Sequence, residues 1–489
     1  MVVKPLYTIS LQKVFSLLEN GLWNSCEENP FSFCPTKVVE DLTTIAYSDA
    51  KSMSSISLLL TSGRIYYLHL MMVRWELQKD LDALLKMLSE DVCRNIRKLS
   101  IPKKLTSDGI TLLEAVLRRC SNLEDVYSEI LFDLSALTGC KEMRYLRFHV
   151  ESNNEAFDFT SRTDFDVLRL LNNLKILAFC NGHVRCFLDH EAVAKILLNS
   201  PKLISVGYVD TLNPLAYILN KESDSPPHFE LRRCFWGHSE WDLRYLRYLN
   251  QYKSNYPEYI KMAVSFCPFV EDLVLLVFHK ECLQHLTNLQ HLTFLCLNFH
   301  HYGSDDYISD LISFLKKIGP QLRHIAVEAA AKMPLDVICD LCPNLESLLL
   351  VNPSITESAE PSLCLKRLKR LSCGNINKET LMYLLSNCRD LTELTLSRAE
   401  CLEDGLLTII LKRNPLPKLK VVLIRKCSLS KDGLRLLLLR VPSLERVYIS
   451  NKQREVIDLI NELNLETEQL PLYAYVPDFF CRRKFTCTF

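Results

Sequence analysis

The sequence predicts an α/β fold in which one short strand and one helix form a unit that repeats along the chain. A Leu-x-x-Leu-x-Leu phrase recurs from near residue 63 to near residue 450, often directly after a Pro or Cys that closes an apolar helical stretch. Its clearest copies begin at Leu345, Leu391 and Leu444. Because side chains alternate along a strand, each copy turns its leucines to one face and the intervening residues to the other.

The spacing of these copies leaves room for a helix in each unit. Leu345, Leu368 and Leu391 open successive copies and lie 23 residues apart. Residues 379–388 carry apolar side chains at helical spacing between two such copies. A strand phrase alternating with a helix is the signature of the leucine-rich repeat. The sequence therefore predicts an α/β leucine-rich-repeat solenoid, a right-handed horseshoe with parallel strands on the concave face and helices on the convex face.

The first 60 residues lack the repeat and predict a small α-helical segment. Ser10 to Trp23, Pro35 to about Tyr47, and about Lys51 to Leu60 each show apolar residues along one helical face. Pro35 suits the first turn of a helix, where its missing N–H costs nothing. We expect residues 1–60 to form either an adaptor-binding box or an N-terminal cap.

The rest of the chain divides into the repeat array and a tail. The array is expected over residues 61–465, with a long convex-side loop between Lys221 and Pro257. Residues 466–489 are expected to form a C-terminal cap or tail, because the end units of a solenoid must cover an otherwise exposed core.

Composition narrows the class of protein. The formal net charge is zero, which gives no sign of nucleic-acid or membrane binding, and no stretch of about 18 apolar residues suggests a membrane span. No secretory signal is visible at the N-terminus. Many of the 20 cysteines occupy repeat positions, Cys120, Cys267, Cys342 and Cys388 among them. As small buried thiols they indicate a reducing compartment, cytoplasmic or nuclear.

The motifs of common enzymes are missing from the sequence. It contains no phosphate-binding loop, dinucleotide fingerprint, His-Glu-x-x-His motif or nucleophile elbow. His300 and His301 near Asp305 and Asp306 are better explained as solvated loop residues than as a metal site. We therefore expect no catalytic residues, no metal and no cofactor, and predict that the protein is not an enzyme.

The repeats, with Cys-Pro or Cys-x-x before the leucine phrase, resemble the cysteine-containing leucine-rich repeats of ubiquitin-ligase substrate receptors. Ser10-Leu11-Gln12-Lys13-Val14-Phe15, followed by Phe33-Cys34-Pro35 and the segment to Leu42, resembles the box of Elongin-linked cullin receptors, of the BC-box and von Hippel–Lindau-box kind. In that family the first helix inserts into Elongin C and the second meets the cullin. The chain departs from the family pattern at Phe15, Glu19 and Cys34. An F-box, which binds a Skp-type adaptor, and a plain solenoid cap are the alternative interpretations.

The resemblance implies a substrate-recognition adaptor of a cullin-RING E3 ubiquitin ligase. Its partners would be Elongin B/C or a Skp-type adaptor, a cullin, and a protein substrate of unknown identity. The adaptor-binding residues would be Leu11, Val14, Phe15, Leu18, Pro35, Val38, Val39 and Leu42. The alternative is a non-ligase leucine-rich-repeat scaffold or inhibitor of the ribonuclease-inhibitor-like kind.

The substrate is expected on the concave strand positions. These positions are largely apolar up to about residue 351 and become polar or charged further on, as at Arg370, Glu393 and Arg425. An apolar patch left exposed on a stiff surface usually marks a partner site. The predicted substrate-binding residues are Val274, Leu276, Phe294, Leu349 and Val351. The alternative is that a segment of the same chain, such as Leu470 to Phe480, covers this patch.

Overall fold

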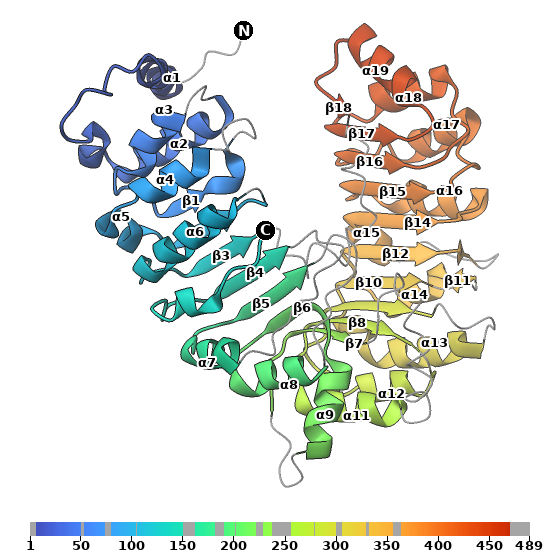
Figure 1. Cartoon of the computed structure of the whole chain (residues 1–489). Helices are drawn as coiled ribbons and strands as arrows, with labels where there is room; N and C mark the ends of the chain where they lie inside the picture. The colour runs from blue at the N-terminus through green and yellow to red at the C-terminus, as the bar shows by residue number, and fades with distance from the viewer. Residues whose placement is uncertain are drawn as a thin grey trace. The chain divides into compact units, whose positions relative to one another are not determined.

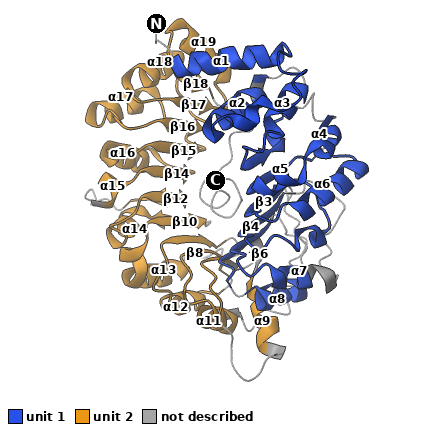
Figure 2. Cartoon of the chain, turned by 90° about the vertical axis from the view of Figure 1, so that its left-hand side faces the viewer, with its two compact units in different colours: residues 1–209 blue, residues 210–489 orange. Residues whose placement is uncertain are grey.

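The computed structural model (Figure 1) describes residues 6–49, 53–73, 80–103, 105–149, 162–180, 190–200, 202–221, 228–236, 256–277, 279–299, 306–328, 332–355 and 363–469. The chain divides into two compact units, Met1–Val209 (unit 1) and Asp210–Phe489 (unit 2), coloured separately in Figure 2. Most of the expected Lys221–Pro257 loop, the candidate covering segment Leu470 to Phe480, and His300, His301 and Asp305 lie outside the described residues.

Unit 1 begins with helices and continues with strands and helices in alternation. The first helices are α1 (Leu6–Glu19), α2 (Thr36–Asp49) and α3 (Met53–Leu60), with the 3-10 turn η1 (Pro30–Phe33) before α2. The strands, each parallel to the one before, are β1 (Tyr67–His69), β2 (Lys98–Ile101), β3 (Asp125–Ser128), β4 (Tyr145–His149), β5 (Ile176–Cys180) and β6 (Ser205–Asp210). The helical elements between them are η2 (Leu70–Met72), α4 (Leu81–Met87), α5 (Glu90–Asn95), α6 (Ser107–Arg119), η4 (Leu134–Leu137), α7 (Arg162–Leu170) and α8 (His190–Asn199).

Unit 2 continues the same alternation. Its main strands are β7 (Arg233–Trp236), β8 (Asp272–Leu276), β9 (Phe294–Asn298), β10 (His324–Glu328), β12 (Ser347–Val351), β14 (Arg370–Gly374), β15 (Glu393–Ser397), β16 (Val421–Ile424), β17 (Arg446–Ile449) and β18 (Glu468–Gln469). They too pair in parallel. The helical elements are α9 (Leu212–Lys221), α11 (Tyr256–Phe266), α12 (Cys282–Leu286), α13 (Asp306–Ile318), η7 (Gly319–Gln321), α14 (Leu335–Leu341), α15 (Leu363–Arg367), α16 (Lys378–Asn387), α17 (Asp404–Arg413), α18 (Lys431–Arg440) and α19 (Gln453–Glu462). A two-stranded sheet pairs β11 (Met333–Pro334) with β13 (Pro353–Ser354).

The α/β leucine-rich-repeat fold predicted from the sequence is confirmed by this arrangement. Within each unit the helices lie along one side of the parallel strands (Figure 1). The phrase leucines Leu348, Leu371 and Leu394 are register partners on β12, β14 and β15 and are at most 4% exposed. Burying one leucine side chain stabilises the folded state by about 1.5–3 kcal/mol, so a continuous column of them holds successive repeats together.

Polar side chains also tie each repeat to the one before it. The amides of Asn122, Asn173 and Asn344 donate to main-chain carbonyl oxygens 24 to 32 residues earlier, at N–O distances of 2.8, 3.2 and 2.8 Å. All three stand directly before the first leucine of a phrase. These bonds satisfy main-chain carbonyl groups at the turns between repeats, which would otherwise need hydrogen bonds from water.

Several helices begin at a hydroxyl that the preceding repeat holds in place. Thr106 caps α6 by accepting from the Gly109 N–H at 2.9 Å and donates to Asp82 Oδ2 at 2.6 Å. Ser430 caps α18 and donates to Asp404 in the same way. A Cβ at Gly109 would lie 2.2 Å from Asp82 Oδ1, so glycine at this position leaves room for the carboxylate.

The helix boundaries near the N-terminus differ from the prediction at one element. The first helix runs over Leu6–Glu19 instead of Ser10 to Trp23. It ends early because Gly21, with φ +73°, adopts a left-handed conformation and donates to the Leu18 carbonyl at 3.0 Å. The domain boundaries at residues 60 and 465 stay predictions, and β18 adds a paired strand just beyond the second.

Candidate functional site

The N-terminal helices bury the apolar face that the sequence predicts as adaptor-binding. Helix α1 packs against α2, and Leu11, Phe15 and Leu18 are 8%, 8% and 1% exposed. The exposure expected of a free docking stripe is therefore not observed at these residues. The physical reason is that two amphipathic helices remove more apolar area from water by packing together.

The remaining predicted adaptor residues fall into three environments. Val39 and Leu42 on α2 are buried, and Val14 and Val38 are half-buried. Pro35, directly before α2, is exposed. The adaptor-binding role of all eight residues stays a prediction, and of these Pro35 is the one that is exposed in this structure.

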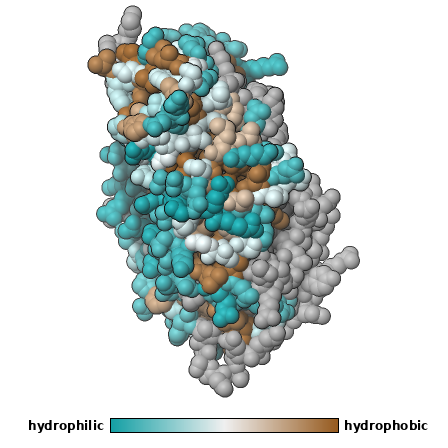
Figure 3. All heavy atoms as spheres, turned by 60° about the vertical axis from the view of Figure 1, so that its left-hand side comes forward, coloured by the Kyte–Doolittle hydropathy of each residue, from teal (hydrophilic) through white to brown (hydrophobic). Residues whose placement is uncertain are grey.

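A different group of apolar side chains is exposed on this segment. Leu6, Phe33, Leu22 and Ile9 are 80%, 74%, 56% and 49% exposed. Leu6 and Ile9 are three residues apart, which places them on one side of α1, away from the buried face. Figure 3 shows apolar side chains gathered at the upper end of that view, the end at which Figure 1 draws α1. Sequence reasoning missed Leu6 and Ile9 because it began the helix at Ser10.

Polar contacts fasten α1 to α2 and hold this surface in shape. Tyr7 Oη donates to Asp41 Oδ2 at 2.8 Å, and Lys37 Nζ lies 2.7 Å from Asp41 Oδ1. The hydrogen bond from Lys37, reinforced by that from Tyr7, lowers the pKa of Asp41. Asn29 ties the connection to α3 by donating to the Leu58 carbonyl at 2.6 Å. The exposed residues therefore stand on a segment that is ordered by its own contacts.

The predicted substrate-binding residues occupy the open face of the unit 2 sheet, opposite the phrase leucines. Side chains alternate along a strand, so Leu349 and Val351 on β12 lie on the face opposite Leu348 and Leu350. Val274, Leu276, Phe294 and Leu349 are nevertheless only 8%, 6%, 2% and 9% exposed, and Val351 is half-buried. The expected exposure of this apolar patch is thus not observed, and its role in substrate binding stays a prediction.

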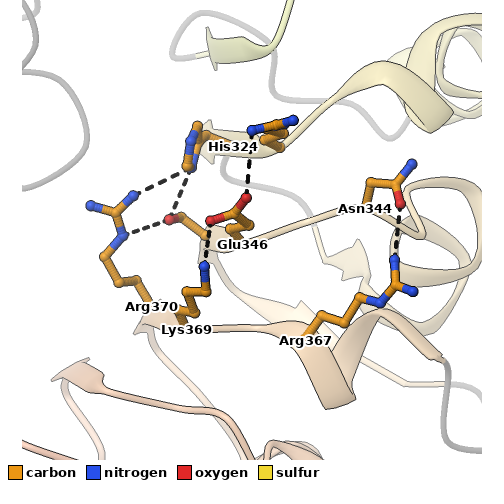
Figure 4. Close-up of polar contacts among 8 residues, drawn as sticks. His324, Asn344, Glu346, Arg367, Lys369 and Arg370 are labelled. Atoms are coloured by element: carbon orange, nitrogen blue, oxygen red, sulfur yellow. Dashed lines mark hydrogen bonds and ion pairs between the residues drawn. The ribbon is translucent and has the colours of Figure 1, made fainter.

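A polar group lies directly beside this patch on the same face of the sheet. His324, Ser347 and Arg370 are register partners on β10, β12 and β14. Ser347 Oγ lies 3.0 Å from His324 Nδ1 and accepts from Arg370 Nε at 2.7 Å. Figure 4 shows the side chains of His324 and Arg370 turned toward each other, with Arg370 Nη2 3.5 Å from His324 Nδ1. These contacts link three successive strands across the open face.

A ladder of ion pairs runs beside this polar group, at the residues just before each strand. Lys369 Nζ lies 2.9 Å from Glu346 Oε2, and Arg323 Nη1 lies 3.9 Å from Glu346 Oε1. The hydrogen bond from Lys369 lowers the pKa of Glu346. Arg367 donates to Asn344 Oδ1 at 3.2 Å (Figure 4). The basic run from Arg367 to Arg370 therefore links neighbouring repeats.

Exposed cations gather where β15 and β16 end. We call Arg398, Arg425 and Lys426, all exposed, the basic rim. Leu396 pairs with Ile424 and Ala399 bridges Cys427, so Arg398 and Lys426 occupy neighbouring positions on adjacent strands. Sequence reasoning noted Arg425 alone. The missed signal was spacing, because Arg398 and Lys426 each lie seven residues after the first leucine of their phrase.

The expected burial of the repeat cysteines is confirmed. Cys120, Cys267, Cys342, Cys373 and Cys388 are at most 1% exposed, and all are free thiols. Burial raises the pKa of the Cys342 and Cys373 thiols to about 12. They behave as small apolar core residues.

Within the described ranges, no helix combines the length and the apolar character that crossing a membrane requires.

Comparisons with known proteins describe likeness of fold. No protein-family model matches the chain. No curated protein sequence matches it either. Among solved structures, the yeast Rad7–Elc1 complex is similar, with 14% identity over 88% of this chain and 96% of that chain and a TM-score of 0.47. An internalin of Listeria monocytogenes shares 14% identity over 80% of this chain and 93% of its own, with a TM-score of 0.33. A leucine-rich-repeat protein of Leptospira interrogans shares 14% over 78% and 91%, with a TM-score of 0.26. At these values the matches carry no functional assignment, and the leucine-rich-repeat fold rests on the strands and helices of this chain itself.

Proposed function

We propose that the chain is a substrate-recognition adaptor of a cullin-RING ubiquitin ligase. Its N-terminal helices bind an Elongin- or Skp-type adaptor, and the open sheet face of the solenoid binds a protein substrate. The protein performs no chemistry in this proposal. It raises the rate of ubiquitin transfer by holding the substrate near the loaded carrier, which replaces a bimolecular encounter with a local one.

The observation that carries the proposal is the exposed apolar group on the N-terminal helices. Leu6 and Phe33 are 80% and 74% exposed, although the opposite face of α1 is fully packed. A helix that serves only as a cap has no need of a second apolar face. Exposed apolar side chains on an ordered segment favour a partner surface, so we place the adaptor contact along α1 and the connection to α2, at Leu6, Ile9, Leu22, Phe33 and Pro35.

Charge placed on this surface provides the test. Leu6→Asp combined with Ile9→Asp should abolish co-purification of Elongin B/C or a Skp-type adaptor with the full chain from cells. Both side chains already face water in the free protein, so the melting temperature should stay unchanged. In the complex, each carboxylate would be buried without a partner.

Leu11→Asp serves as the matched control. Leu11 is 8% exposed, so a carboxylate there should lower the free energy of unfolding by several kcal/mol in the absence of any adaptor. Full adaptor recovery with the Leu6/Ile9 double variant would refute the proposed contact. Adaptor loss in that variant together with a lowered melting temperature would show that the surface is structural.

The non-ligase scaffold is a second candidate, and one observation favours it. The predicted anchor Leu11 packs inside the chain with Phe15 and Leu18, as expected of a solenoid cap. In that case no Elongin- or Skp-type adaptor co-purifies with the wild-type chain, while proteins bound to the open sheet face still do.

A further inference from the structure

Side chains on the open face of unit 2 are more deeply buried than the described elements explain. Phe294, Cys296 and Leu349 are 2%, 4% and 9% exposed, although they alternate along β9 and β12 with the phrase leucines and point away from the helices. The described helices of unit 2 lie on the other side of its strands (Figure 2). In unit 1, Tyr127 on β3 also has a strand on either side of it, yet it stays half-buried. Flanking strands therefore do not account for burial of this depth, and other atoms cover these side chains.

The buried positions form one continuous apolar surface. Val274, Cys296, Ala326 and Leu349 are successive register partners on β8, β9, β10 and β12. Ala326, in the middle of this row, is 0% exposed. We call these four residues, with Phe294, the covered patch. Because apolar surface leaves water most favourably against other apolar surface, the cover of this patch is expected to be apolar as well.

The end of the chain supplies a segment of this character. The sequence continues for 20 residues beyond Gln469, the last residue of β18, and β18 is the final strand of the unit 2 sheet. Residues 470–480 read Leu-Pro-Leu-Tyr-Ala-Tyr-Val-Pro-Asp-Phe-Phe, with one charged side chain, that of Asp478. Their apolar and aromatic side chains match the chemistry of the covered patch.

The length of this segment fits the distance to the patch. In the order of the sheet, β12 is the fifth strand before β18 and β9 is the seventh. Neighbouring strands lie about 4.8 Å apart, which places Leu349 about 24 Å and Phe294 about 34 Å from β18. Eleven residues can span at most about 40 Å. Residues 470–480 are therefore long enough to reach both side chains from Gln469.

We infer that residues 470–480 bind the covered patch of the same molecule and occupy the open face of unit 2. The inference goes beyond the proposed function and does not depend on the adaptor. Because the segment is tethered to the sheet, its binding is intramolecular, with an effective concentration in the millimolar range. A protein substrate that uses this face has to displace the segment first. The end of the chain is then an internal competitor, which raises the affinity that a substrate needs.

Alkylation of Cys296 in the native full chain tests this inference. Cys296 carries a thiol on the covered patch, whereas the thiol of Cys342 lies in the core. Phe479→Asp combined with Phe480→Asp should raise the rate of N-ethylmaleimide labelling at Cys296 at least about tenfold, because a carboxylate is poorly accommodated on an apolar surface. Mass spectrometry measures the rate at each thiol. An unchanged rate at Cys296 would overturn the inference, and so would an equal rise at Cys342, which would indicate general unfolding.

Two further double variants locate the cover. Phe485→Asp with Phe489→Asp is the matched control, because it adds the same charges beyond residue 480 and should leave the labelling of Cys296 unchanged. An equal rise in both tail variants would overturn the assignment to residues 470–480. Tyr245→Asp with Tyr248→Asp places the charges in the connection between β7 and α11. A rise in this variant, with none in the Phe479/Phe480 variant, would assign the cover to that connection instead.

A fluorescein-labelled peptide of residues 470–480 gives a direct measurement by fluorescence anisotropy. It should bind the Phe479/Phe480 double variant of the full chain at least about tenfold more tightly than the wild-type chain, in which the attached segment competes. The same peptide carrying Phe479→Asp and Phe480→Asp should bind neither chain. Equal affinity of the unmodified peptide for both chains would contradict the inference. Adaptor co-purification is measured separately through Leu6 and Ile9, so either proposal can fail without the other.

Discussion

The side-chain amide of Asn414 donates to the main-chain carbonyl of Cys388 at 3.1 Å and so joins the ends of two successive helices, α16 and α17. The same nitrogen donates to the Leu385 carbonyl at 2.7 Å, and the amide oxygen accepts from the Leu416 N–H at 3.2 Å. Asn414 is 2% exposed. In another repeat a thiol makes a similar but weaker contact. There Cys140 Sγ lies 3.3 Å from the main-chain carbonyl oxygen of Cys120, at the end of α6.

Asn414→Leu should lower the free energy of unfolding by about 2–4 kcal/mol. The substitution leaves buried carbonyl and N–H groups without partners, and each such group costs about 1–3 kcal/mol. Urea denaturation followed by circular dichroism measures the loss. Asn122→Leu is the control, because Asn122 donates one bond to a carbonyl from an exposed position. An equal loss in both variants would contradict the role assigned to burial.

Removing one partner of the ion pair between Arg147 and Asp125 should lower the free energy of unfolding. Arg147 Nη2 lies 2.6 and 2.8 Å from the two carboxylate oxygens of Asp125, and the side chains are 12% and 15% exposed. Arg147→Met should lower the free energy of unfolding by about 1–3 kcal/mol, because it leaves a largely desolvated carboxylate without its cation. Adding Asp125→Asn should recover part of this loss in a double-mutant cycle. Strictly additive effects would show that the two groups do not interact.

Buried thiols should make the fold sensitive to alkaline pH. Burial raises the pKa of Cys373 to about 12, above the value near 8.5 of an exposed thiol. Its contribution to stability is complete below the unfolded pKa and is lost as the pH rises toward the folded pKa, since only the unfolded chain then releases the proton. The free energy of unfolding should fall by about 1.4 kcal/mol per pH unit for each such thiol. Cys373→Ala should reduce this slope in urea titrations, and Cys26→Ala, at an exposed position, should not. An unchanged slope in Cys373→Ala would refute the argument.

Alanine substitutions at two glycines, Gly319 and Gly405, should change the free energy of unfolding in opposite directions. A Cβ at Gly319 would lie 2.3 Å from the main-chain oxygen of Leu341, so Gly319→Ala should lower the free energy of unfolding by about 1–3 kcal/mol. Gly405 lies in the first turn of α17 and has no atom within 4 Å of a built Cβ. Gly405→Ala should therefore raise the free energy of unfolding by about 0.5–1 kcal/mol. Thermal melts compare the two, and a gain in Gly319→Ala would contradict the close approach.

The sequence by itself determined the repeating unit and the face on which its leucines lie. Leu348, Leu371 and Leu394 could be placed in one buried column because a strand alternates with period two and the phrase recurs at a regular step. The burial of Cys388 followed from the same periodicity. These features are local, so the pattern alone predicts them.

Only the tertiary structure decided what lies against each face. Periodicity gave α1 an apolar face at Leu11 but could not reveal that α2 covers it while Leu6 stays exposed. Leu349 lies opposite the phrase leucines, but the sequence left open whether that face is exposed or covered, and in the structure this side chain is 9% exposed. The neighbouring positions of Arg398 and Lys426 depend on the register between β15 and β16. Hydrophobic burial is not directional, so a sequence shows which side chains share a face, and long-range packing selects the partner of that face.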